Sequence, residues 1–196
     1  MTALVTVAGM LQAARTPLSD RTVWLATGAA WALSSAILLA GPAYWDPATV
    51  LDWVAVLAYT AAWLLFGPAI VLASRLVPSR SARFVALLLA VAAAVTGVAN
   101  VVEDGLGVAA AGTLYVTAIL VATMLLVPLA YLFARDRSNA LAILAIVLFV
   151  GIGFTSGGGG GPLVLAAFVV LALRTQWFLP RRPTLPPDAE LAAGPS

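Results

Sequence analysis

Residues 83–104 read RFVALLLAVAAAVTGVANVVED, with Arg83 at one end, Glu103 and Asp104 at the other, and no charged residue between them. A helix rises about 1.5 Å per residue, so the stretch from Arg83 to Glu103 is about 30 Å long. That length equals the thickness of the hydrocarbon core of a bilayer. The stretch therefore predicts a helix that crosses a membrane, with a basic end at one surface and an acidic end at the other.

The composition of the whole chain agrees with a membrane protein. Of its 196 residues, 63% are hydrophobic and 9% are charged, and the mean hydropathy is +1.06. An ordinary soluble domain is about half apolar and about a quarter charged. We therefore expect an all-α, polytopic membrane protein without a separate soluble domain.

Apolar stretches long enough, or nearly long enough, to cross a bilayer recur along the chain. The predicted spans are residues 22–41, 50–77, 82–102, 108–134, 139–154 and 162–179. Residues 1–21 form an N-terminal segment, in which residues 1–14 are either an interfacial helix or a disordered lead. Residues 22–179 form the transmembrane domain, a bundle of about six helices, and residues 180–196 form a proline-rich tail.

Charges test this count, because successive loops lie on alternate sides of the membrane. Six spans place all ten arginines on one side, and place Asp46, Asp52, Glu103 and Asp104 on the other. The positive-inside rule makes the arginine side cytoplasmic. We therefore expect a multi-pass protein of a bacterial cytoplasmic membrane, with both termini in the cytoplasm.

The residue types that are missing exclude several kinds of chemistry. The chain has no Cys, His or Lys. This excludes disulfides, thiol and imidazole catalysis, almost every zinc site, and a Schiff base to retinal or pyridoxal. We therefore expect no cofactor and no bound metal. The net charge of +2 comes from scattered arginines and does not indicate nucleic-acid binding.

Polar and aromatic residues in the first four predicted spans recur at helical spacing, which indicates faces turned to the bundle interior. The faces are Trp24, Gly28, Trp31 and Ser35; Asp52, Tyr59, Trp63 and Phe66; Thr96, Asn100, Glu103 and Gly107; and Thr113, Thr117, Met124 and Tyr131. Counted along the helices, Glu103, Asp104 and Asp52 lie at the outer rim, with Asn100 about one turn deeper. Together these positions predict an outward-facing mouth.

A ligand site in this mouth is the sharper hypothesis. We expect Asn100, Glu103, Asp52, Trp31, Tyr59, Trp63 and Thr96 to bind a small-molecule or lipid-like ligand. Carboxylates attract a cation and aromatic faces add cation–π contacts, so a cationic or amphiphilic ligand is favoured. The simpler alternative makes Trp24 an interfacial anchor, Asp46 a helix cap, and Asp104 with Gly105 a turn.

Three functions remain open at this point. The first is a small-molecule transporter or a membrane substrate-binding subunit. It is favoured by the mouth and by a repeated pattern, in which Pro68 precedes Arg75 and Pro128 precedes Arg135 by seven residues. A glycine run ending at Pro162 could form a lid or a plain linker.

The second function is a metal-free intramembrane enzyme acting on a lipid or isoprenoid. Glu103 would be its general acid, assisted by Asp52 or Asp104. The third is an accessory, assembly or sensor subunit that forms a homo- or hetero-oligomer through the third span. That span carries a row of small residues at four-residue spacing, which lets helices approach closely: Ala82, Ala86, Ala90 and Ala94.

Overall fold

The chain is helical throughout the parts described by the structure, a computed structural model that covers residues 18–41, 46–154 and 160–180. Within these ranges there is no strand, which confirms the all-α class. The α-helices are α2 (Leu18–Leu39), α3 (Val50–Ser74), α4 (Arg80–Asn100), α5 (Ala110–Arg135), α6 (Asn139–Gly153) and α7 (Gly161–Leu173). A π-helix, η1 (Val101–Gly105), follows α4, and a 3₁₀-helix, η3 (Thr175–Phe178), follows α7.

Several predictions fall outside the described residues. They concern residues 1–14, most of the tail and most of the glycine run.

Only some of the helices are long enough to cross a bilayer. Four helices, α2 to α5, have the length and apolar composition of membrane spans, with η1 extending the third to Gly105. α6 has 15 residues and α7 has 13, against the roughly 20 that a crossing requires. The predicted sixth span, residues 162–179, was too long, because α7 ends at Leu173 and the chain turns into η3.

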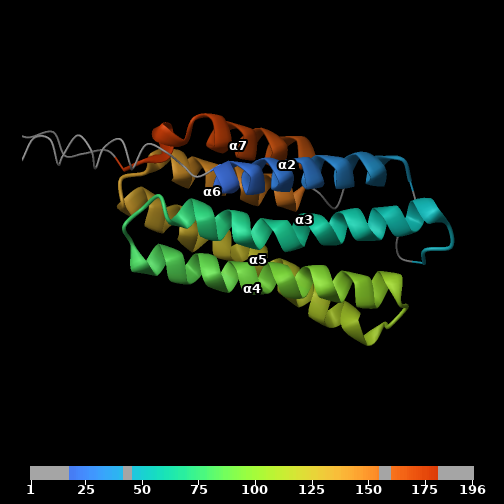
Figure 1. Cartoon of the computed structure of the whole chain (residues 1–196). Helices are drawn as coiled ribbons and strands as arrows, with labels where there is room; N and C mark the ends of the chain where they lie inside the picture. The colour runs from blue at the N-terminus through green and yellow to red at the C-terminus, as the bar shows by residue number, and fades with distance from the viewer. Residues whose placement is uncertain (1–17, 42–45, 155–159, 181–196) are drawn as a thin grey trace, which may run out of the picture.

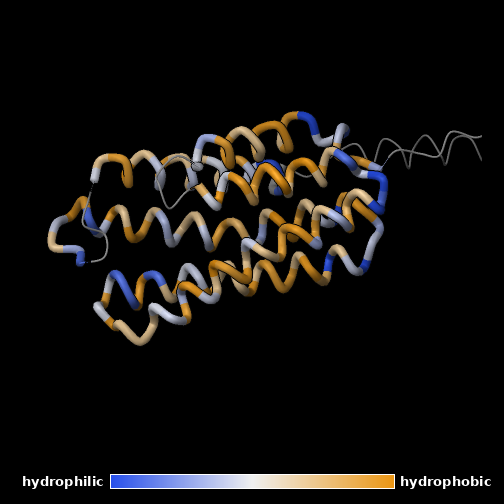
Figure 2. Tube along the Cα trace, turned by 180° about the vertical axis from the view of Figure 1, so that it is seen from behind, coloured by the Kyte–Doolittle hydropathy of each residue, from blue (hydrophilic) through white to orange (hydrophobic). Residues whose placement is uncertain are grey.

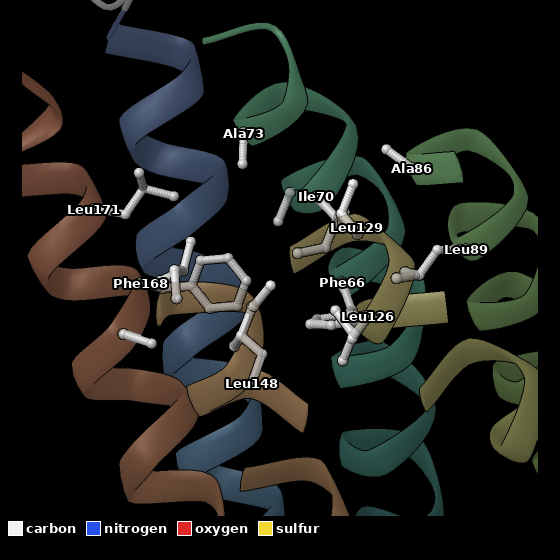
Figure 3. Packing of buried hydrophobic residues seen from close by; sticks show 14 of the residues in the cluster. Phe66, Ile70, Ala73, Ala86, Leu89, Leu126, Leu129, Leu148, Phe168 and Leu171 are labelled. Carbon is white, nitrogen blue, oxygen red and sulfur yellow. The ribbon is translucent and has the colours of Figure 1, made fainter. Parts of the chain in front are cut away.

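The helices form a closed ring in chain order. Each helix packs against the next, and α7 packs against α2 to close the ring (Figure 1). The interior is filled with apolar side chains that point toward one another from α3, α4, α5, α6 and α7 (Figure 3). Phe66, Leu126, Leu148 and Phe168 are among its fully buried members. The centre of the ring at this level is therefore a packed core.

Large apolar side chains also cover the outside of the ring. Phe84 is 61% exposed, Val91 63% and Tyr131 68%. Hydrophilic residues gather at the two ends of the bundle, with hydrophobic residues along the length between them (Figure 2). Water would not tolerate so continuous an apolar surface, and this distribution suits a lipid environment. It also places Met124 and Tyr131 on the outside, so the predicted interior face of the fourth span was wrong.

Charged residues sort to the two ends of the ring, because neighbouring helices run in opposite directions. The basic end carries the described arginines, Arg21, Arg75, Arg80, Arg83, Arg135, Arg137 and Arg174. The acidic end carries Asp46, Asp52, Glu103 and Asp104. The short pair α6 and α7 leaves the basic end and returns to it, so the sorting is the same whether that pair crosses the membrane or turns back inside it. The charges therefore do not require six full crossings.

Side chains of α2 hold α3 beside its proline. The indole N–H of Trp24 donates to the carbonyl of Ala69 over 3.0 Å, and the hydroxyl of Thr27 donates to the carbonyl of Leu65 over 3.2 Å. Pro68 lies between these two carbonyls and has no N–H of its own, so the α3 backbone is weakened there. Trp24 is fully buried. It fastens two helices, and the interpretation of Trp24 as an interfacial anchor was wrong.

Small residues bring other helix pairs into close contact. A Cβ atom on Gly67 would lie 2.9 Å from the Cα of Ala90, so α3 and α4 touch through their backbones. Ala82 and Ala86, which lie on α4 as Ala90 does, are fully buried. A partner at the alanine row could therefore reach Ala94, which is exposed, but neither of these two.

The contact between α2 and α7 depends on Gly161. Its N–H donates to the hydroxyl of Ser35 over 3.0 Å. A Cβ atom at this position would collide with the Ser35 side chain and with the carbonyl oxygen of Trp31. This last residue of the glycine run is therefore a packing contact.

We expect Gly161→Ala to lower the free energy of unfolding by about 1–3 kcal/mol, because the added methyl group must push α7 away from α2. Gly153→Ala is the matched control, since no atom lies within 4 Å of its Cβ position. The control should be neutral or slightly stabilising, because alanine favours a helix more than glycine does. Thermal unfolding of both variants in detergent measures the difference, and equal unfolding midpoints would contradict the role of Gly161.

Candidate functional site

The residues predicted to bind a ligand extend from the acidic end of the ring to Trp63 near the middle of α3, but Asp52 has a structural role. Asp52 and Thr49 form a capping box at the start of α3. One carboxylate oxygen of Asp52 accepts from the N–H and the hydroxyl of Thr49, over 2.8 and 2.7 Å. Such a box satisfies backbone groups at a helix start. The cap of this helix is therefore Thr49, and the alternative that Asp46 caps it was wrong.

Asn100 and Thr96 are buried on the inward face of α4, as their spacing predicted. The side-chain amide of Asn100 donates to the hydroxyl of Thr60 over 3.0 Å and to the carbonyl of Val56 over 3.4 Å. The hydroxyl of Thr96 donates to the carbonyl of Ala92, one turn earlier in its own helix, over 2.9 Å. Asn100 therefore ties α4 to α3 directly below the acidic rim.

The π-helix η1 turns Glu103 toward α5. The N–H of Leu106 bonds to the carbonyl of Val101 over 2.9 Å, five residues back, which is the wider winding of a π turn. Such turns are frequent at functional sites. The carboxylate of Glu103 lies against Gly112 of α5, where a Cβ atom would collide with it. Its Oε2 atom is buried and has no hydrogen-bond partner among the described residues.

Asp104 is mostly buried beside Glu103, with 9% of its surface exposed. The next residue, Gly105, lies against the ring of Trp53, which its Cβ would approach to 3.1 Å. An ordinary surface turn would leave the aspartate in water, so the interpretation of Asp104 and Gly105 as a plain turn was incomplete. Both carboxylates of η1 face protein.

Tyr115 is a site residue that the sequence reasoning missed. It lies three residues after Gly112, on the same face of α5 and about one turn deeper. Its hydroxyl donates to the hydroxyl of Tyr59 over 3.2 Å, so the pair bridges α5 and α3. The sequence feature that marks the inward face of α5 is its row of small residues, and not its threonines. These small residues are Gly112, Ala118 and Ala122.

Trp31, Tyr59 and Trp63 form one aromatic cluster, together with Phe66. The ring of Trp31 lies 6.2 Å from Tyr59, 5.2 Å from Trp63 and 6.0 Å from Phe66, always edge to face. Trp31 and Trp63 are fully buried. The N–H of each indole has no hydrogen-bond partner in the described part of the chain. A neighbouring ring is at best a weak acceptor, so both donors are energetically costly.

The site therefore has a rim, a bridge and a floor. Glu103 at the rim offers a buried carboxyl oxygen, the Tyr59–Tyr115 pair forms the bridge, and Trp31 with Trp63 forms an aromatic floor with two indole donors; among the described residues neither that oxygen nor these donors have a hydrogen-bond partner. Among the described residues, no three His, Cys, Asp or Glu side chains gather to hold a metal ion. The arrangement suits a positively charged or amphiphilic organic group.

No protein-family model matches the chain, and neither a curated protein nor a solved structure is significantly similar to it. Function is therefore inferred from the geometry of the site alone.

We expect Thr60→Val to destabilise the protein by about 1 kcal/mol, because it removes the better acceptor of the buried Asn100 amide. Thr117→Val is the control. Thr117 also donates a hydrogen bond, to the carbonyl of Thr113, but it is exposed on the outside of the ring. The control should change the unfolding free energy by less than about 0.5 kcal/mol. Equal losses in the two variants, measured by denaturant unfolding in detergent, would contradict a special role for Asn100.

Proposed function

We propose that this chain is a multi-pass membrane protein that binds a small cationic or amphiphilic molecule at its acidic end. It would act as a carrier or as the substrate-binding subunit of a transporter. One observation carries the proposal. Three of the buried polar atoms without a hydrogen-bond partner among the described residues belong to the predicted site: Oε2 of Glu103 and the indole nitrogens of Trp31 and Trp63.

The cost of these atoms is the reason to expect a ligand. A carboxyl oxygen buried without a hydrogen-bond partner is energetically unfavourable. A bound cation would offset this cost at Glu103, and the aromatic faces of the cluster would add cation–π attraction. A polar group on the same ligand could accept from the indole N–H groups below the tyrosine bridge. The ligand would then lie between Glu103 and the tryptophan floor.

The alternative of a metal-free enzyme is less favoured. It needs an acid and an assisting carboxylate, and the carboxylate of Asp52 is already engaged in the capping box. Asp104 alone would be left to assist Glu103. A third function, that of an accessory subunit without a ligand, would be supported if the chain does not bind the cation in the test described below.

Tetraphenylphosphonium, a lipophilic cation, is a suitable first probe, and tetraphenylborate is an anion of the same shape. We expect the cation to bind saturably, measured by quenching of tryptophan fluorescence in detergent or nanodiscs, and the anion not to. Glu103→Gln keeps the size of the side chain and removes the charge, and should weaken cation binding about tenfold, which corresponds to about 1.4 kcal/mol.

The matched control for the binding test is Asp46→Asn, which removes an exposed acid from the same end of the bundle. The control should bind the cation as the unmodified chain does. Equal affinity for cation and anion, or an equal loss in both variants, would contradict the proposed site. Uptake into proteoliposomes then separates a carrier from a binding subunit.

The proposed orientation places the basic end in the cytoplasm of a bacterial cell, with both termini on that side. The chain has no cysteine, so single introduced cysteines report the side directly. A membrane-impermeant maleimide should label Ala48→Cys at the acidic end of intact cells, and should label Pro78→Cys at the basic end only after permeabilisation. The reverse pattern would overturn the orientation.

Phe154→Cys tests the number of crossings separately. Phe154 follows α6 at the end of the short pair and is 66% exposed. We expect labelling from outside if α6 and α7 complete the proposed six spans. Protection from the reagent on both sides would show that the pair turns back inside the bilayer, which leaves four spans with the same orientation.

A further inference from the structure

A groove runs along the outside of the ring between α6 and α7, at the basic half of the bundle. Its volume is about 350 Å³, and its lining includes Ala140, Ile143, Val147, Ala166, Val170 and Trp177. Ile143 and Trp177 are each 60% exposed, so the groove opens away from the packed core. In a membrane it would face lipid.

The groove is apolar along its length and is bounded by about two turns of helix on each side. Residues 140–147 of α6 form one wall, and residues 163–170 of α7 form the other. η3 closes the groove at the basic end with Trp177 and Phe178. Alanines in both walls make it hollow where larger side chains would fill it.

A cation lies at the closed end. The guanidinium carbon of Arg174 sits 5.2 Å from the centre of the Trp177 ring, and that ring is part of the wall. Arg135 and Arg137 lie at the turn between α5 and α6, with Asp136 between them. The charge at this end of the groove is therefore positive overall, at the level where lipid headgroups would lie.

We propose that the groove binds one acyl chain of an anionic phospholipid, with the phosphate held by Arg174. An apolar channel with a cation at its headgroup end matches the two halves of such a lipid. A helix of a partner protein would need an apolar face but not the arginine. The site lies at the opposite end of the bundle from Glu103 and does not depend on the proposed function.

The test compares phosphatidylglycerol with phosphatidylcholine of the same acyl chains, by native mass spectrometry of the full chain. We expect the anionic lipid to be retained in preference. Arg174→Gln should reduce its retention about fivefold, whereas Arg80→Gln should not. Arg80 has the same charge at the same end of the bundle, but lies on α4. Equal retention of the two lipids, or an equal effect of the two variants, would overturn the proposal.

A second variant tests the groove itself. Ala166→Phe places a ring in the channel from an exposed position and should reduce retention of phosphatidylglycerol about tenfold, while the exposed Ala94→Phe on α4 should not. Soluble glycerol phosphate should not compete, because the acyl chain supplies the larger part of the affinity. Competition by glycerol phosphate, or loss of a dimer in place of a lipid in Ala166→Phe, would show that the groove has another occupant.

Discussion

Every polar group inside a bilayer must find its partner within the protein, and this constraint governs the whole bundle. Trp24 and Thr27 meet it at the carbonyls beside Pro68, Ser35 meets it at the first residue of α7, and Asn100 meets it at Thr60. Each of these bonds joins two helices, so the few polar residues of an apolar chain also determine which helices are neighbours. Buried polar atoms without a partner among the described residues are correspondingly informative. Three of them belong to Glu103, Trp31 and Trp63, and the others to Ser34 and Asp136.

Much of the fold could be predicted because hydrophobic length and charge placement are local properties of the sequence. The third span has an arginine near one end and two acids at the other, and the structure keeps both at opposite ends of the bundle. The inward faces of α2, α3 and α4 also follow from spacing, since Trp31, Trp63 and Asn100 are all buried. The number of full membrane crossings could not be predicted in the same way. The positions of the arginines show only that α6 and α7 together return to the end of the bundle from which they started.

The site was harder to predict, because a polar side chain can meet the same constraint in two ways. A threonine can bond back to its own helix and face outward, as Thr117 does, so hydroxyls on α5 gave the wrong face. Small residues indicate close helix contacts more reliably than threonines do. Gly112 lies on the face of α5 that carries Tyr115, and the carboxylate of Glu103 packs against this face. The indole of Trp24 has a partner 45 residues away, which only a three-dimensional structure can reveal. The partner of Asp52 is Thr49, three residues earlier, so its capping role is a local one.

Because the helices differ in length, the two halves of the bundle contain different numbers of helices. Near the basic end all six described α-helices contribute, while α6 and α7 stop short of the acidic end that α2 to α5 reach (Figure 1). α7 begins where Gly161 meets Ser35 and the backbone of Trp31. The partnerless indole of Trp31 thus lies where the ring changes from six helices to four. Because α6 and α7 are short, the part of the bundle nearest the acidic end is enclosed by α2 to α5 alone.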